Sequence, residues 1–63
     1  MPTRIRFLDK ELSVDVADEL EEVRGRIEGE ARSGRLVRLV RHAPEGQLVW
    51  VNPAAVAYLE EVP

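Results

Sequence analysis

The chain contains no cysteine, one histidine, and one residue each of Phe, Trp and Tyr. Without cysteine it can form neither a disulfide framework nor a cysteine-ligated zinc site. Its apolar runs fall far short of the roughly 18–20 residues that a membrane-spanning helix needs, and its first residues lack the apolar stretch of a signal peptide. We therefore expect a soluble, cytoplasmic protein that does not associate with membranes.

Motifs for catalysis and cofactor binding are also missing. His42 is the only histidine and Ser13 and Ser33 are the only serines, so no Ser–His–Asp or Cys–His arrangement is indicated. The side chains of adjacent acidic pairs, such as Glu21-Glu22 and Glu60-Glu61, do not converge on one metal ion. No glycine-rich phosphate loop is present. We predict that the protein is not an enzyme and has no catalytic, cofactor or metal site.

The length of 63 residues predicts one small domain over residues 1–63. A chain of this size buries only about 60% of its unfolded surface, and small domains usually gain stability from disulfides, metals or a partner chain. The first two are not indicated, which favours association with another chain. Nine basic and twelve acidic side chains give a net charge of −3, which argues against a general polyanion binder. Eight of the nine basic residues are Arg, which reflects either a bacterial-like bias typical of GC-rich genomes or a need for forked hydrogen bonds to carboxylate or phosphate.

Residues 3–14 alternate between apolar and polar side chains. Ile5 and Phe7 would lie on one face of a strand, and Arg4 and Arg6 on the other. A polar break at positions 9 and 10 separates them from two further apolar positions. This pattern predicts a β-hairpin with one buried and one solvated face.

The apolar period changes over residues 15–33. Apolar positions spaced by four, three, four and four lie on one side of a helix. They are Val16, Leu20, Val23, Ile27 and Ala31. Asp15 is the predicted N-cap, and Gly34 the residue that ends the helix. Gly25 and Gly29 lie four positions apart, so they are either tolerated glycines or mark the close approach of another backbone.

The second half of the chain predicts another hairpin. Residues 35–42 fit either a strand or a short helix, and the turn signal at residues 43–46 favours the strand. A second apolar run at residues 48–51 would form its partner. Asn52-Pro53 predicts a helical turn. The rest forms either a short helix or, as we favour, a short closing strand.

Together these elements predict an α+β domain with the element order ββαββ(β). An antiparallel sheet of two β-hairpins, with a possible short C-terminal strand, would pack on one amphipathic helix. The predicted core consists of Ile5, Phe7, Leu12, Val14, Leu20, Val23, Ile27, Val37, Leu39, Val49, Val51 and Val56.

The second hairpin carries more apolar side chains than one helix can cover. If one face packs on the helix, five residues are left on the other: Leu36, Arg38, Val40, Leu48 and Trp50. Either the sheet curls into a small barrel and covers them, or they meet a second copy or a different protein. We predict that these residues contact a second copy or a different protein. The protein would be a non-enzymatic interaction or oligomerisation module, acting as a dimer or docked on a larger protein through these five residues.

A nucleic-acid-binding regulator is the alternative. Arginines on the predicted strands could neutralise phosphates, while Trp50 and Tyr58 could stack on bases. These arginines are Arg4, Arg6, Arg35, Arg38 and Arg41. The negative net charge and the acidic helix weigh against this alternative.

Overall fold

The alternating residues at the start of the chain form the first hairpin, as predicted. The computed structural model describes residues 1–63, and its first strands are β1 (Thr3–Phe7) and β2 (Ser13–Val16). They pair antiparallel with Ile5 opposite Val14, so these two apolar side chains lie on the same side of the sheet. The arginines of β1 alternate with its buried residues, which confirms the inward and outward assignment of this strand.

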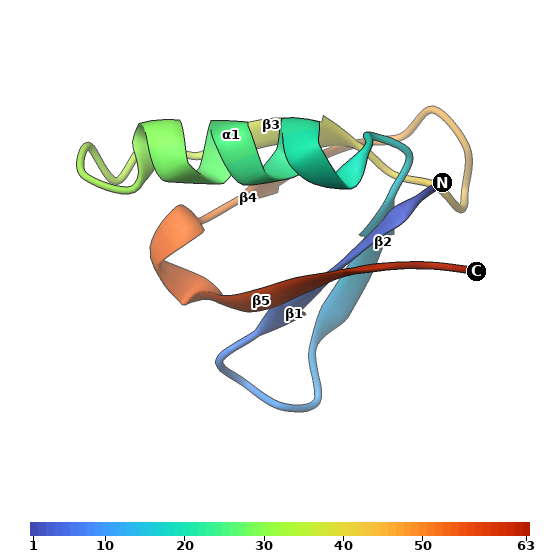
Figure 1. Cartoon of the computed structure of the whole chain (residues 1–63), viewed down its shortest axis with the longest axis horizontal. Coiled ribbons are helices and arrows are strands. Elements are labelled where there is room, and N and C mark those ends of the chain that lie inside the picture. The colour runs from blue at the N-terminus through green and yellow to red at the C-terminus, as the bar shows by residue number, and fades with distance from the viewer.

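The last strand makes β1 the central strand of its sheet. β5 (Val56–Glu61) pairs antiparallel with the other side of β1, giving the order β2-β1-β5. The two ends of the chain therefore lie near each other (Figure 1). A short 3-10 helix, η1 (Pro53–Ala55), precedes β5, and the Asn52 side chain caps it by accepting a hydrogen bond from the N–H of Ala54. The favoured prediction of a helical turn and a closing strand is confirmed.

The second hairpin consists of β3 (Val37–Val40) and β4 (Leu48–Val51), which pair antiparallel. It forms a sheet of its own, connected to the first sheet by one isolated bridge between Val16 and Arg41. The fold is therefore α+β with the predicted order ββαββ(β). The two hairpins lie in two sheets, where a single sheet was expected.

The helix α1 (Leu20–Glu30) is shorter than the predicted span of residues 15–33. The prediction of Asp15 as its N-cap is wrong, because Asp15 lies in β2 opposite Arg4. Glu19 occupies the N-cap position and its side chain makes no capping hydrogen bond. Pairing with β1 holds residue 15 extended, since tertiary contacts override a weak local helical preference. The helix is neither long nor apolar enough to cross a membrane.

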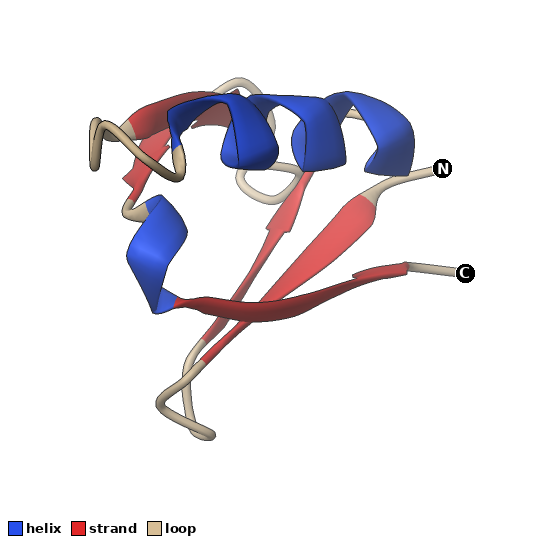
Figure 2. Ribbon diagram, turned by 60° about the vertical axis from the view of Figure 1, so that its left-hand side comes forward, coloured by secondary structure: helices blue, strands red, loops and turns tan.

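The hydrophobic core lies between the helix and the two sheets (Figure 2). Its buried apolar residues are Ile5, Val16, Val23, Val37, Leu39 and Val51, and six partly buried residues pack around them: Phe7, Val14, Ile27, Val49, Val56 and Leu59. Two predicted core residues are not part of this cluster. Leu12 is 57% exposed because it precedes the first residue of β2, and Leu20 is half-buried at the start of α1.

The glycines inside α1 face open space. A Cβ built on Gly25 or Gly29 would meet no atom within 4 Å, so neither residue marks a close backbone approach. Gly34 differs from both, because its φ of 71° lies in the left-handed region. Its N–H donates to the carbonyl of Glu30 at 3.0 Å, so Gly34 closes the turn that follows α1. The helix itself already ends at Glu30, with Ala31 as its C-cap, so the prediction that Gly34 directly follows the helix is wrong.

Alanine at Gly25 or at Gly29 should therefore stabilise the protein. Each substitution removes backbone freedom from the unfolded chain, and we expect the free energy of unfolding to rise by roughly 0.5–1 kcal/mol. The measurement is the urea midpoint of each variant. Gly34→Ala is the matched control and should lower that midpoint, because alanine is strained at this φ. A lower midpoint for Gly25→Ala would show that the helix packs against something at this position.

Candidate functional site

The β3–β4 hairpin has one face on the core and one face on solvent. Val37 pairs with Val51 in the ladder, and these two side chains are buried. The alternate pairs, Arg38 with Trp50 and Val40 with Leu48, lie on the opposite face. Leu36 immediately precedes β3. The structure thus brings the five predicted surface residues together, and we call them the outer face: Leu36, Arg38, Val40, Leu48 and Trp50.

The apolar side chains of the outer face are accessible to solvent. Trp50 is 58% exposed, Leu36 55% and Leu48 54%, whereas Val40 is half-buried. The sheets therefore do not curl over Trp50, so the alternative in which they form a small barrel that covers this residue is wrong. The geometric reason is that the chain leaves β4 through η1 and returns to β1, on the far side of the core.

The free side of β3 is closed by segments of the same chain. The N–H of Val40 donates to Oδ1 of Asp18 at 3.1 Å, and the carbonyl of Val40 accepts from the N–H of Ala17 at 2.7 Å. The Arg26 guanidinium donates to the carbonyl of Arg38 at 3.0 Å. Asp18 and Arg26 also form an ion pair at 3.7 Å. Sequence analysis missed this role of Asp18, because nothing in the local pattern indicates that its carboxylate reaches β3.

The free side of β4 is open. In an antiparallel ladder, hydrogen-bonded pairs alternate with non-hydrogen-bonded pairs. Here the N–H of Arg41 donates to the carbonyl of Gln47 at 2.7 Å, so the next pair, Val40 and Leu48, is a non-hydrogen-bonded one. Val40 directs its backbone groups away from β4, so its partner Leu48 directs its own away from β3, and the same holds for Trp50. Neither residue makes a backbone hydrogen bond to any other segment. We call this free side of β4, with the backbone groups of Leu48 and Trp50, the open edge.

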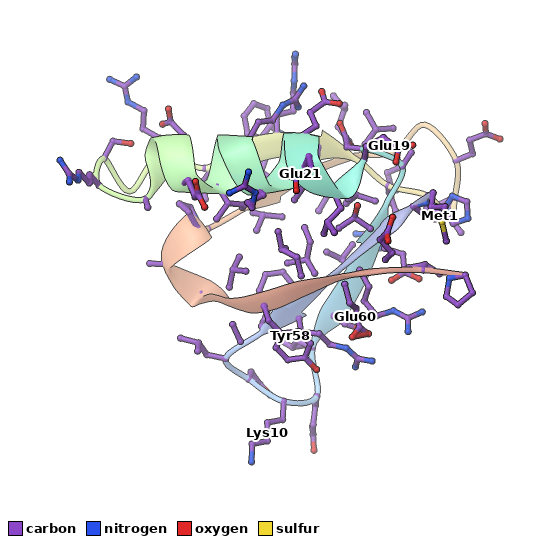
Figure 3. The ribbon with its side chains drawn as sticks, in the orientation of Figure 1. Met1, Lys10, Glu19, Glu21, Tyr58 and Glu60 are labelled. Atoms are coloured by element: carbon purple, nitrogen blue, oxygen red, sulfur yellow. The ribbon has the colours of Figure 1, made fainter.

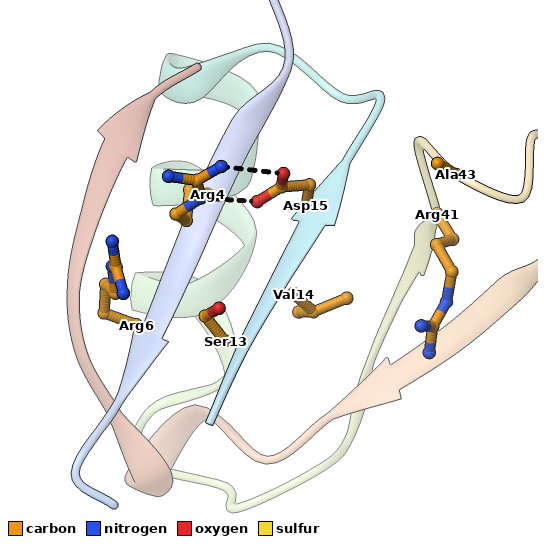
Figure 4. Close-up of a pocket in the computed structure, with 7 residues that line it drawn as sticks. All are labelled: Arg4, Arg6, Ser13, Val14, Asp15, Arg41 and Ala43. Carbon is orange, nitrogen blue, oxygen red and sulfur yellow. Dashed lines mark hydrogen bonds and ion pairs between the residues drawn. The ribbon is translucent and has the colours of Figure 1, made fainter. Parts of the chain in front are cut away.

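The arginines of β1 face carboxylates of the neighbouring strands, and Figure 4 shows Arg4 against Asp15 of β2. Arg4 donates from Nε to Oδ1 of Asp15 at 2.8 Å and from Nη2 to Oδ2 at 3.1 Å. Arg6 donates to Glu60 at 3.4 Å. The hydrogen bond from Arg4 lowers the pKa of Asp15 below its ordinary value, and the same bond raises the pKa of Arg4.

An open cavity of about 350 Å³ lies beside this ion pair. Its lining brings together Arg4, Arg6 and Arg41, three of the five arginines considered for nucleic acid. The Nε atoms of Arg6 and Arg41 are buried and make no hydrogen bond. Arg4 is already engaged by Asp15. The remaining two arginines, Arg35 and Arg38, form no ion pair and are exposed.

A second cavity, of about 500 Å³, was not indicated by the sequence. It lies where the tip of the first hairpin meets β5, and apolar residues form most of its lining: Phe7, Leu8, Ala57 and Tyr58, with Arg6 and Lys10. Figure 3 shows Tyr58 on β5 and Lys10 at the hairpin tip. The sequence signal that could have located it is Tyr58, the only tyrosine of the chain. Its charged lining residues, Arg6 and Lys10, are both cationic.

The remaining candidate residues do not form a reactive group. His42 is exposed, and the hydroxyl of Ser33 donates to the carboxylate of Glu30 at 2.9 Å. Ser13 begins β2, whereas Ser33 lies in the turn after α1. No group of three histidine, aspartate or glutamate side chains is placed to hold a metal ion.

Comparison of the chain with protein-family models, with curated proteins and with solved structures finds no match. The outer face and the open edge are therefore interpreted from their own chemistry.

The Arg4–Asp15 pair should make stability depend on pH. Folding lowers the pKa of Asp15, so its contribution is fully present above the ordinary value of about 4 and is lost as pH falls through the lower folded pKa. Asp15→Asn should therefore reduce the urea midpoint near neutral pH, and the difference from the parent chain should shrink in acid. Glu45→Gln, at a position without an ion pair, is the control and should change little. Equal midpoints for Asp15→Asn and the parent chain at neutral pH would contradict this prediction.

Proposed function

We propose that this protein is a non-enzymatic interaction module that self-associates through the outer face. The observation that carries the proposal is the exposure of the only tryptophan beside two aliphatic side chains on a face that no part of the chain covers. Soluble monomers rarely expose large contiguous apolar patches, and such patches mark binding surfaces. Trp50, Leu48 and Val40 supply the apolar centre of the proposed interface.

The charges around the outer face support the same assignment. Arg38, directly opposite Trp50, forms no ion pair, and the strand β4 carries no charged residue. An apolar centre with an arginine at its margin is the usual composition of a protein–protein interface, in which Trp and Arg contribute most to the binding energy. Arg4 and Arg6, by contrast, are engaged by carboxylates of their own sheet.

The small core gives a further reason for association. Only eight of the 63 residues are buried, and five large apolar side chains besides Trp50 and Leu48 are more than half exposed. They are Met1, Leu8, Leu12, Leu36 and Tyr58. A chain with so little buried surface has a narrow stability margin, and burial of the outer face against another chain would widen it.

Replacing Trp50 with Glu should weaken self-association, because a carboxylate at the centre of the interface would lose its hydration on binding. The measurement is the solution mass by light scattering over a concentration series. Leu12→Glu is the matched control, since Leu12 is 57% exposed but lies in the first hairpin, away from the outer face. We expect the parent chain and Leu12→Glu to increase in mass with concentration, and Trp50→Glu to remain a monomer. A parent chain that stays monomeric throughout would contradict the proposal.

The single tryptophan provides an independent measurement in the parent chain. Association should move the Trp50 emission to shorter wavelength as the protein is concentrated, because the indole leaves water. Addition of single-stranded and duplex oligonucleotides at low salt should leave this emission unchanged. An emission change that salt reverses would instead support nucleic-acid binding.

A further inference from the structure

We propose that two copies of this chain pair edge to edge through β4, in antiparallel orientation, with Val49 of one copy opposite Val49 of the other. This inference rests on the proposed function, and it names the partner and the register of the interface. The open edge forms the contact, and the outer faces of the two copies meet there, with Trp50 of each copy against Leu48 of the other.

The backbone of β4 offers the hydrogen bonds that such pairing needs. The N–H and C=O groups of Leu48 and Trp50 point away from β3, and no segment of the chain bonds to them. A strand with unpaired groups on one side is a template for another strand. β4 (Leu48–Val51) is short, but it contains no charge, proline or bulge, three of the features with which proteins block an exposed edge.

The other strand edges are less suited to pairing. The free side of β3 is occupied by Asp18, Ala17 and Arg26, as described above. β2 is closed by its bridge to Arg41 and by the hydrogen bond from the N–H of His42 to the carbonyl of Asp15. β5 carries two glutamates at its end. β4 is therefore the one edge that is both uncharged and unoccupied.

The ends of β4 select one register. Placing Leu48 opposite Leu48 of the second copy would draw Gly46 into the ladder, but its φ of 82° belongs to the turn. Placing Trp50 opposite its counterpart would draw in Asn52, which caps η1 with its side chain and accepts from the N–H of Ala55. With Val49 opposite Val49, Leu48 faces Trp50 of the other copy, and each such pair exchanges both backbone hydrogen bonds.

The side chains of the outer face are compatible with this register. Across the four strands, one row would read Arg38, Trp50, then Leu48 and Val40 of the second copy. The symmetric row runs in the opposite direction, as a two-fold interface requires. The two copies of Arg38 then lie at opposite corners, so like charges are not brought together. Aromatic and aliphatic residues opposite each other on neighbouring strands stabilise a sheet.

The absence of cysteine from the chain allows a clean cross-linking experiment. In the proposed register the two copies of Val49 form a pair without backbone hydrogen bonds between them. Their Cα atoms lie about 4.5 Å apart, within the range of a disulfide. The two copies of Leu48 are diagonal neighbours at about 7–8 Å, which is too far. Val49→Cys should therefore oxidise to a linked dimer about tenfold faster than Leu48→Cys, although Leu48 is the more exposed of the two.

A second arm does not depend on the fold of the Val49 variant. Leu48→Cys and Trp50→Cys should each form little linked dimer alone, whereas a mixture of the two should form the mixed disulfide, because these residues face each other in the proposed register. All variants are checked for the parental circular dichroism spectrum, and linked species are identified by mass. Equal or faster linkage of Leu48→Cys alone would indicate random collision and would overturn the register.

The outcomes separate this inference from the proposed function. If Trp50→Glu abolishes association but neither arm gives selective cross-links, the outer face binds by stacking of faces, and edge pairing is wrong. If the parent chain remains monomeric and no variant links selectively, both proposals fail. Selective linkage in both arms, with association that depends on Trp50, supports both.

Discussion

The structure depends on how much surface one short helix can cover. α1 has eleven residues, and it contributes a single fully buried side chain, Val23, to the core. Residues from both sheets complete that core, so each sheet has one face turned inward and one turned to solvent. The outer face of the β3–β4 hairpin is the consequence, because the chain has no further element with which to cover it. The same limit on size that gives the domain a small core also leaves apolar side chains of this hairpin exposed to solvent.

The two sheets are held in place by a small set of polar contacts near the start of the helix. Asp18, whose side chain is 11% exposed, bonds the N–H of Val40 and pairs with Arg26. Its own carbonyl accepts from the buried hydroxyl of Thr3 at 2.8 Å. This residue therefore connects β1, α1 and β3, and it gives β3 a satisfied edge while β4 has none. The second hairpin therefore has one closed edge, on β3, and one open edge, on β4.

Much of the fold could be predicted from local patterns. The alternation of Ile5 and Phe7 with Arg4 and Arg6 located the first hairpin, because a strand with one buried face has a period of two. The turn signal at residues 43–46 separated the strands of the second hairpin in the same way. The outer face was predicted because the second hairpin carries more apolar side chains than one helix can cover. These features depend on spacing along the chain, and spacing is preserved whatever the tertiary arrangement.

The failures lie where long-range pairing competes with a local preference. Asp15 and Val16 fit the start of a helix, but β1 pairs with them and makes Val16 one of the most buried residues. Leu12 fits the apolar face of a strand, yet it lies outside β2 and is exposed. The sequence by itself determined which strands have two apolar faces, through the identity of alternate residues. Only the tertiary structure decided which backbone edge remained open, because that depends on Asp18, Ala17 and Arg26 reaching β3 from a distant part of the chain.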